Sequence, residues 1–381
     1  MGSGWMRGER AALLTGNGAG ERRRGDMQFL VGGGLDFEQS PLELRERIAF
    51  RSEELTRALP LLRQELGLEE AVLVSPCNRV EYVGINRDAK LSRTGWGRFL
   101  GSYHGIHADW GAYSQFRQGR ACIDHLFELV SGLRSMVIGE TEIFGQVKAA
   151  YEAAHRLQTT GVWLNRLFQT SFSAAKAARS RTFITRGNVS VSSVAVELAE
   201  RLFGDLSGRS VMVLGAGETS EKTLRALEGR GVSLLLVANR TYGRACDLMK
   251  EFHGEAILWS EFLERSSDVD IVISSTSAPH YILTREKLLP LLARRNGDPL
   301  FLIDLAVPRD IDPSVHALDG LYLYNIDDLQ TIARQNLEDR AAEIARCRRL
   351  LEPHVERFVT WAEQRQKRAH GPDIMGDFRT A

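Results

Sequence analysis

Apolar and polar positions alternate in blocks along the second half of the chain. Runs of consecutive aliphatic residues are separated, for the most part, by helical or loop segments. Continuous apolar strands with helical crossovers are typical of a parallel sheet that is covered on both faces. We therefore expect residues 187–325 to form a doubly wound, Rossmann-type α/β domain. The predicted strands are residues 211–215, 234–240, 256–258, 270–276, 301–304 and 321–324.

Residues 27–186 have a different pattern. Short β-type runs such as MQFLVGGGL and VEYVGI alternate with helical ones up to about residue 120, and a helical region follows. This mixture predicts an N-terminal α+β domain. In its helical part, Glu142 and Gln146 lie one turn apart, beside a stripe of apolar residues at helical spacing that we expect to be buried. The stripe consists of Ile143, Val147, Ala150, Tyr151 and Ala154.

The two ends of the chain differ from these domains. Residues 326–381 continue as a charged helical pattern to about residue 368, where Pro353 is expected to kink or restart the helix. A long amphipathic helix after two domains is typical of a packing or oligomer-forming arm. Residues 1–26 are rich in Gly and Arg and contain only the short apolar run AALL. We expect them to be a disordered extension, with order beginning near Met27.

Composition narrows the class of protein. Lys plus Arg and Asp plus Glu both number 49, so the chain has no overall field that would attract DNA. No apolar run is long enough to span a bilayer or to serve as a signal peptide, which makes the cytoplasm the expected compartment. The cysteines lie far apart, without metal-ligand spacing, so neither disulfides nor a metal site is expected. They are Cys77, Cys122, Cys246 and Cys347.

A glycine-rich turn follows the first predicted strand of the α/β domain. In VMVLGAGETSEKTLRAL, Gly215, Ala216 and Gly217 come directly after the strand and open a helix with Glu218, Thr219 and Ser220. Glycines allow the backbone to turn tightly and let a pyrophosphate approach the N-terminus of the helix. The small Ser220 occupies the third glycine position. This context predicts a dinucleotide site rather than a plain tight turn.

The end of the second strand indicates which dinucleotide is bound. An acidic residue there would bind the ribose 2′-hydroxyl of NAD. This chain instead has Asn239, Arg240 and Thr241. Because a guanidinium suits a 2′-phosphate in charge and geometry, NADPH is favoured over NADH.

The segment SPCNRVEY places an unpaired thiol in a predicted turn between two strands. A thiolate is stabilised by a nearby cation, and Arg79 is two residues from Cys77. Together with a nicotinamide site, such a thiol is suited to forming a thioester that a hydride then reduces to an aldehyde. From the local sequence alone, an inert surface cysteine remains the alternative.

Several segments resemble the glutamyl-tRNA reductase family, in order, between about residues 27 and 340. They are SPCNRVEY, GLRSMVIGETEIFGQVKAAYEAA, FQTSFSAAKAARSRTFI, GAGETSEKTLRAL, VANRT, DIVISSTSAP, LIDLAVPRDIDPSV and YLYNIDDLQTI. The resemblance implies NADPH-dependent reduction of glutamyl-tRNA(Glu) to glutamate-1-semialdehyde, the entry step of five-carbon tetrapyrrole synthesis. It also implies V-shaped homodimers in which a long spinal helix joins a catalytic domain, here residues 27–186, to the NADPH domain and a C-terminal dimerisation domain. Glutamate-1-semialdehyde aminomutase, the downstream enzyme, is a further partner that the resemblance admits.

The resemblance also assigns site residues. Cys77 matches the nucleophile of the family, and His125 matches a histidine important for activity that would assist thiolate formation or proton transfer. Arg79 would bind the free carboxylate of the glutamyl group. The remaining positions that would contact substrate are Pro76, Asn78, Ser135, Glu140, Thr141, Glu142 and Gln146. The arginines Arg346, Arg348 and Arg349 would either contact the tRNA backbone or line the solvated side of a helix.

The chain departs from the family pattern at four places. Pro76 replaces a threonine, Arg134 replaces an aspartate, and Asp36 and Phe37 replace Asn and His. The C-terminal domain is also shorter than in many members. These changes leave two alternatives open: a divergent paralogue that binds tRNA, NADPH or a partner enzyme without reducing anything, and a shikimate-dehydrogenase-like oxidoreductase.

Overall fold

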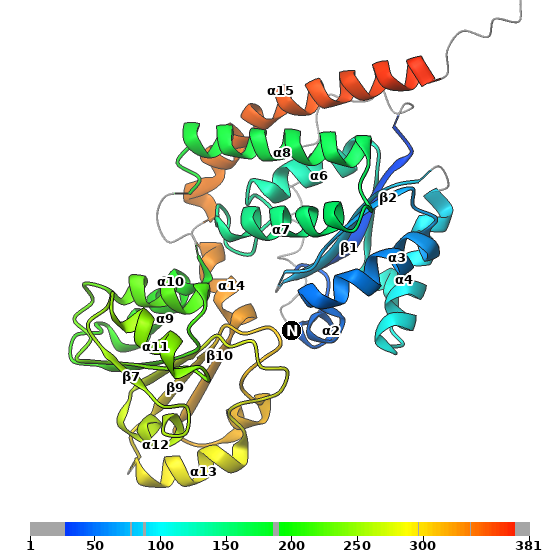
Figure 1. Cartoon of the computed structure of the whole chain (residues 1–381). Helices are drawn as coiled ribbons and strands as arrows, with labels where there is room; N and C mark the ends of the chain where they lie inside the picture. Colours follow the sequence, from blue (N-terminus) through cyan, green and yellow to red (C-terminus); the bar gives the residue numbers. More distant parts are fainter. Residues whose placement is uncertain are drawn as a thin grey trace, which may run out of the picture.

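The computed structural model describes residues 27–76, 78–86, 89–185, 190–295, 297–335 and 337–369. The described chain folds around two sheets, one antiparallel and one parallel, and a long C-terminal helix packs on the helices that cover the antiparallel sheet (Figure 1). The expectations for residues 1–26, for the Cys77 side chain and for the tail beyond residue 369 lie outside these ranges. None of the helices within the ranges is long and apolar enough to cross a membrane.

The N-terminal sheet has four strands in the order β2-β3-β1-β4, and every neighbouring pair is antiparallel. Helices pack around it, and the residues buried between them form one continuous apolar core. The strands are β1 (Leu30–Asp36), β2 (Glu70–Val74), β3 (Arg79–Ile85) and β4 (Gln115–Gln118). The helices are α2 (Leu42–Ile48), α3 (Leu55–Leu66), α4 (Ala89–His104), α5 (Trp110–Tyr113), α6 (Arg120–Val130), α7 (Glu142–Arg156) and α8 (Val162–Arg181).

Helix α7 buries the stripe that its sequence predicts. Ile143, Val147, Ala150 and Ala154 are buried, and Tyr151 is half-buried with its ring stacked on that of Phe168 at 5.2 Å. Helical spacing places these side chains on one face, which packs toward α6, α8 and β2. Glu142 and Gln146 consequently lie beside the buried face.

The second sheet contains six parallel strands in the order β10-β9-β8-β5-β6-β7, which confirms the doubly wound topology. Alternate residues of β5 enter the separate apolar cores on the two faces of this sheet, as expected for strands covered on both sides. The strands are β5 (Ser210–Leu214), β6 (Leu234–Ala238), β7 (Glu255–Ile257), β8 (Ile271–Ser274), β9 (Leu300–Asp304) and β10 (Leu321–Asn325). The helices are α9 (Val191–Phe203), α10 (Glu218–Leu227), α11 (Tyr242–Met249), α12 (Phe262–Arg265), α13 (Arg285–Arg294) and α14 (Ile326–Gln335).

Helix α15 (Leu337–Ala369) runs alongside α8 and contacts α6 (Figure 1). The expected restart at Pro353 is wrong, because the helix continues through this residue. A proline inside a helix costs about 3 kcal/mol, but buried side chains on both sides of Pro353 hold α15 against the N-terminal core. These side chains are Ile344, Cys347, Leu351, Val355, Phe358, Val359 and Ala362.

Candidate active site

The glycine-rich turn joins β5 to α10 and requires glycine at its first position. Gly215 has φ +113°, and its N–H donates to the carbonyl of Ala238 on β6 at 2.8 Å. A Cβ at this position would lie 2.8 Å from the carbonyl oxygen of Ser275 and 3.0 Å from Oγ of Ser220. The turn is therefore held tightly against the loop that follows β8.

Gly217 leaves space above the N-terminus of α10. It is the N-cap residue of this helix, and a Cβ added to it would meet nothing within 4 Å. Ser220 is fully buried, with its Oγ 2.9 Å from that of Ser275, so this third position packs the helix against the sheet. Glu218 is exposed and Thr219 half-buried in the same first turn. Free N–H groups and open space at a helix N-terminus suit a pyrophosphate.

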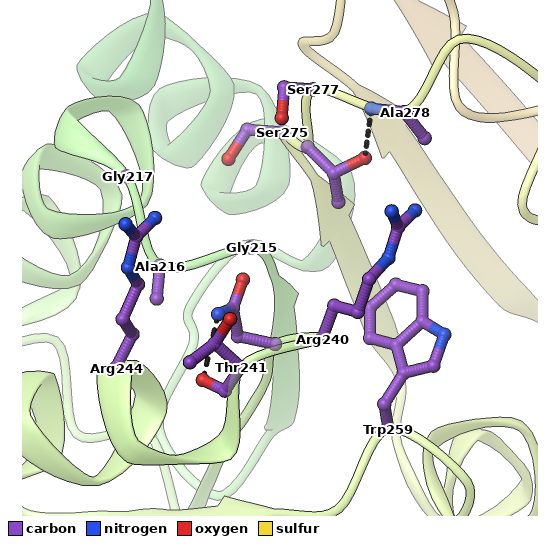
Figure 2. A pocket seen from close by; sticks show the side chains of 12 residues that line it. Gly215, Ala216, Gly217, Arg240, Thr241, Arg244, Trp259, Ser275, Ser277 and Ala278 are labelled. Carbon is purple, nitrogen blue, oxygen red and sulfur yellow. Dashed lines mark hydrogen bonds between the residues drawn. The ribbon is translucent and has the colours of Figure 1, made fainter.

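A cavity of about 320 Å³ lies over the carboxyl ends of β5, β6 and β8, where open α/β sheets bind their ligands (Figure 2). The sequence-predicted residues Asn239, Arg240 and Thr241 line it. The Asn239 amide donates to the Thr241 carbonyl at 2.9 Å, which fixes the turn at the end of β6. Lining residues that sequence reasoning missed are Arg244, Trp259, Ser275, Thr276, Ser277 and Ala278.

Two arginines flank this cavity. Arg240 lies beside Trp259, whereas Arg244 lies near the Gly217 end of the turn (Figure 2). Both are exposed, and neither makes an ion pair with another described residue. No carboxylate lines the cavity. Its nearness in the sequence could have indicated Arg244, which lies in α11, the helix that begins two residues after Arg240.

A second cluster is buried beside the N-terminal sheet and centres on Glu81 of β3. One oxygen of this carboxylate, Oε1, accepts from Nη1 of Arg79 at 2.7 Å, and the other, Oε2, lies 2.7 Å from Nε2 of His125 on α6. The three residues are between 2% and 7% exposed. Sequence reasoning singled out Arg79 and His125 but missed the carboxylate that joins them.

The environment of this cluster fixes its protonation. Burial alone would raise the pKa of Glu81, but His125 and Arg79 outweigh it and hold that pKa well below its usual value. Burial lowers the pKa of His125, so the imidazole is neutral near neutral pH and donates Nε2–H to the carboxylate. Its other nitrogen, Nδ1, is buried without a hydrogen-bond partner among the described residues. This arrangement leaves Nδ1 as a proton acceptor.

Two of the departures from the family pattern contact Arg79. Its Nη2 donates to the backbone carbonyl of Arg134, and its guanidinium lies 5.8 Å from the ring centre of Phe37. The Arg134 side chain instead pairs with Glu128, Nε to Oε2 at 2.6 Å. Arg348 of α15 donates to the other oxygen of Glu128 at 2.8 Å, so it packs against the N-terminal half. The proposed contact of Arg79 with a substrate carboxylate stays a prediction.

Acidic residues before and in α7 extend the cluster toward the nucleotide-binding half. Burial raises the pKa of Glu140 to about 7, with Glu142 adding to this effect and the Ser135 hydroxyl opposing it. Glu142 pairs with Lys222 of α10 at 2.8 Å, which links the two halves. The remaining candidates, Thr141 and Gln146, have no hydrogen bond from their side chains to this cluster among the described residues.

The turn that carries Cys77 can be described from its flanks. The Pro76 carbonyl accepts from the N–H of Arg79 at 3.4 Å, and Oδ1 of Asn78 accepts from Arg45 at 3.0 Å. The three cysteines within the described residues are unpaired, and burial raises the pKa of Cys122 to about 12 and that of Cys347 to about 11. Among the residues that the structure describes, no three His, Cys, Asp or Glu side chains are grouped so that they could hold a metal ion.

Comparisons with known proteins match each half of the chain to a domain family, and most of the chain to complete proteins. Residues 34–182 match the model of the glutamyl-tRNA(Glu) reductase N-terminal domain, and residues 197–332 match that of shikimate/quinate 5-dehydrogenase. A glutamyl-tRNA reductase of Akkermansia muciniphila is 43% identical over 85% of this chain and 96% of its own length. The chain belongs to the glutamyl-tRNA reductase family.

Other members of the glutamyl-tRNA reductase family agree. The Geobacter sulfurreducens protein of that name is 41% identical over 86% of this chain and 76% of its own length. The solved structure of glutamyl-tRNA reductase from Methanopyrus kandleri shares 36% identity over 90% of this chain and 82% of its own, with a TM-score of 0.49. The two relatives that are 41% and 43% identical, together with the dehydrogenase match of residues 197–332, make the chain an oxidoreductase with an NAD(P)-type dinucleotide domain. The shikimate-dehydrogenase-like alternative is not favoured, since that match covers only the nucleotide-binding half. The non-catalytic alternative is not favoured either, since the relatives that match most of the chain are named as reductases.

Proposed function

We propose that this protein uses NADPH to reduce the glutamyl group of glutamyl-tRNA(Glu) to glutamate-1-semialdehyde, through a thioester on Cys77. The observation that carries the proposal is the buried Arg79–Glu81–His125 cluster, which begins two residues after Cys77 in a chain that also holds a dinucleotide cavity. In this proposal the acyl group and the dinucleotide are held by different halves of the molecule, and the hydride passes from one to the other.

In the first step, the sulfur of Cys77 attacks the carbonyl carbon of the glutamyl ester. A carbon–sulfur bond forms, the carbon–oxygen bond to the terminal ribose breaks, and the ribose oxygen takes up a proton. His125 suits this transfer because Glu81 holds its proton on Nε2, which leaves Nδ1 to accept the thiol proton and return it to the leaving oxygen.

In the second step, the hydride supplied by bound NADPH reduces the thioester carbonyl to the aldehyde and releases the Cys77 sulfur. Gly215, Ala216 and Gly217, with the first turn of α10, would hold the pyrophosphate. Arg240 and Arg244 would hold the 2′-phosphate, because their guanidinium groups are exposed at the cavity and no carboxylate competes for them.

The test is conversion of charged tRNA(Glu) by the purified protein with NADPH. Glutamate-1-semialdehyde should form, and Cys77→Ser should abolish it, whereas Cys246→Ser at a half-buried cysteine should not. Iodoacetamide at neutral pH should label Cys77 far faster than the other three cysteines. Normal turnover by the Cys77→Ser protein would reject the thioester.

Three further properties belong to the same proposal. The protein forms a homodimer through residues 326–381, acts in the cytoplasm in tetrapyrrole synthesis, and hands its reactive aldehyde to glutamate-1-semialdehyde aminomutase. Light scattering would test the homodimer, and co-sedimentation would test the complex with the aminomutase. Arg346 and Arg349 are exposed on α15, and contact with tRNA phosphates would make affinity fall steeply with salt.

A further inference from the structure

Arg45 of α2 is a buried cation that joins three parts of the molecule. Its side chain is 1% exposed, and its Nε donates to the carbonyl of Ser40 at 3.2 Å. Nη1 donates to Oδ1 of Asn78 at 3.0 Å. Nη2 contacts both carboxylate oxygens of Asp327, at 2.6 and 2.8 Å. Asp327 lies in the first turn of α14, after the parallel sheet, so Arg45 connects the turn of Cys77 with the nucleotide-binding half.

The contact with Arg45 determines which way the Asn78 amide faces. A guanidinium has donors only, so the amide must present its oxygen to Arg45. The NH2 group is then left without a hydrogen-bond partner among the described residues. Asn78 follows the proposed nucleophile in the sequence, and an oriented N–H donor at this position is suited to an acyl oxygen on which negative charge develops.

A second ion pair fixes α2 against the same half. Arg309, in the loop after β9, donates from its backbone N–H and from Nε to Oε1 of Glu46 at 2.7 and 2.9 Å. Its Nη2 donates to Oε2 of Glu46 at 2.9 Å. Two adjacent residues of α2 are therefore paired with the nucleotide-binding half. Arg45 donates to Asp327 of α14, and Glu46 accepts from Arg309 in the loop after β9. The position of Arg45 is therefore coupled to that of the nucleotide-binding half.

We propose that Arg45 is a positioning residue for acyl transfer, which directs the Asn78 N–H toward the acyl oxygen and is itself held by Asp327. This inference rests on the proposed function of Cys77. Because lysine presents a single point charge, it cannot satisfy Ser40, Asn78 and Asp327 together in this geometry. Arg45→Lys should therefore disturb the amide while it conserves the charge.

The experiment measures transfer of radiolabelled glutamate from tRNA(Glu) to the protein in a single turnover without NADPH. Arg45→Lys and Asn78→Asp should each slow labelling by on the order of 10²-fold, the loss typical of one donor to a developing oxyanion. The double variant should be no slower than Asn78→Asp alone, because both changes remove the same interaction. Arg47→Lys, at an exposed position of the same helix, should label at the wild-type rate.

Asp327→Asn tests the link to the other half. It should slow labelling by about tenfold or more, as misplacement of a catalytic group does, whereas Asp319→Asn at an exposed site should not. Thermal unfolding identifies any variant that fails to fold. If Arg45→Lys fails to fold, Asn78→Asp tests the inference by itself, because its carboxylate still accepts from Arg45. Labelling of Arg45→Lys at the Arg47→Lys rate, wild-type labelling of Asn78→Asp, or additive losses in the double variant would overturn the inference. Absence of labelling in the wild type would instead reject the proposed function.

Discussion

Nε2 of His125 lies 2.7 Å from Oε2 of Glu81, across a contact that joins residues 44 positions apart in the chain. The other oxygen of this carboxylate is occupied by Arg79, so Glu81 cannot turn away from the imidazole without breaking an ion pair. A fixed carboxylate selects one tautomer of a neutral histidine. The reactive nitrogen of His125 is therefore determined by a residue on another element.

Replacing Glu81 by Gln should lower kcat by about 10²-fold or more, the usual contribution of an oriented general base. A carboxamide offers one acceptor oxygen, which Arg79 and His125 cannot share equally. The loss of the negative charge should also lower the pKa of His125 further and move the acidic limb of the pH–rate profile to lower pH. Glu152→Gln, at an exposed position, is the control. An unchanged profile would contradict the assigned role.

The turn between β5 and α10 gives a contrasting pair of glycine variants. Gly217→Val should weaken NADPH binding strongly at an unchanged melting temperature, because the added atoms enter open space reserved for the pyrophosphate. Gly215→Ala should instead lower the melting temperature, because its φ of +113° and the nearby Ser275 carbonyl both oppose a side chain. Calorimetric titration and thermal unfolding separate the two effects. Equal effects of the two variants on binding would refute this distinction.

Selectivity for NADPH over NADH should depend on the two arginines at the cavity. The double variant Arg240→Ala, Arg244→Ala should lower the ratio of kcat/KM for NADPH to that for NADH by about 10²-fold, since charge-assisted hydrogen bonds contribute about 1.5–3 kcal/mol each. Catalysis with NADH should change little. Arg285→Ala, at an exposed site on α13, serves as control. A preserved ratio would place the 2′-phosphate elsewhere.

Glu140 should give the reaction a pH dependence near neutrality. Its pKa is raised to about 7 by burial, so the carboxylate ionises as the pH rises through this value. An ionised Glu140 would bind the positively charged amino group of the glutamyl residue. We expect kcat/KM to increase up to about pH 7 and then level off, and Glu140→Gln to remove this limb. Parallel profiles of the two proteins would show that another group titrates.

Asp304 should make the fold progressively less stable as the pH rises from about 4 to about 8. Burial, with Asp310 nearby, raises its pKa to about 8, far above the usual value of an aspartate. The folded state therefore holds a proton that the unfolded chain has already lost above about pH 4, and stability falls as the pH rises toward 8. The free energy of unfolding in urea should decrease by up to about 1.4 kcal/mol per pH unit from this group. Asp304→Asn should make the free energy of unfolding depend less steeply on pH. If the wild type and Asp304→Asn depend on pH equally, Asp304 does not contribute.

Local patterns were sufficient to predict the nucleotide-binding half. The central strands β5, β6, β8 and β9 are mainly apolar runs covered on both faces, and the glycine turn and Arg240 lie directly beside such runs. The buried stripe of α7 followed from helical spacing in the same way. Both signals depend on residues that are close together in the sequence, which is why they can be recognised without a structure.

The polar contacts of the N-terminal half could not be predicted in this way. Arg45 and Asp327 are 282 positions apart, and nothing local distinguishes either from a solvated charge on a helix. Glu81 occupies a strand in which an acidic residue would ordinarily face water. The passage of α15 through Pro353 likewise depends on the surface it packs against. Tertiary contacts decide each of these features.

Helix α15 completes the core that begins at β1, so the parallel sheet is an insertion within a discontinuous domain. During synthesis, the N-terminal segment leaves the ribosome before α15 does. The apolar surface on which Leu351, Val355 and Phe358 pack therefore remains uncovered until α15 has been translated. A nascent or prematurely terminated chain would expose this apolar surface to chaperones and proteases. Only a chain translated through α15 covers it.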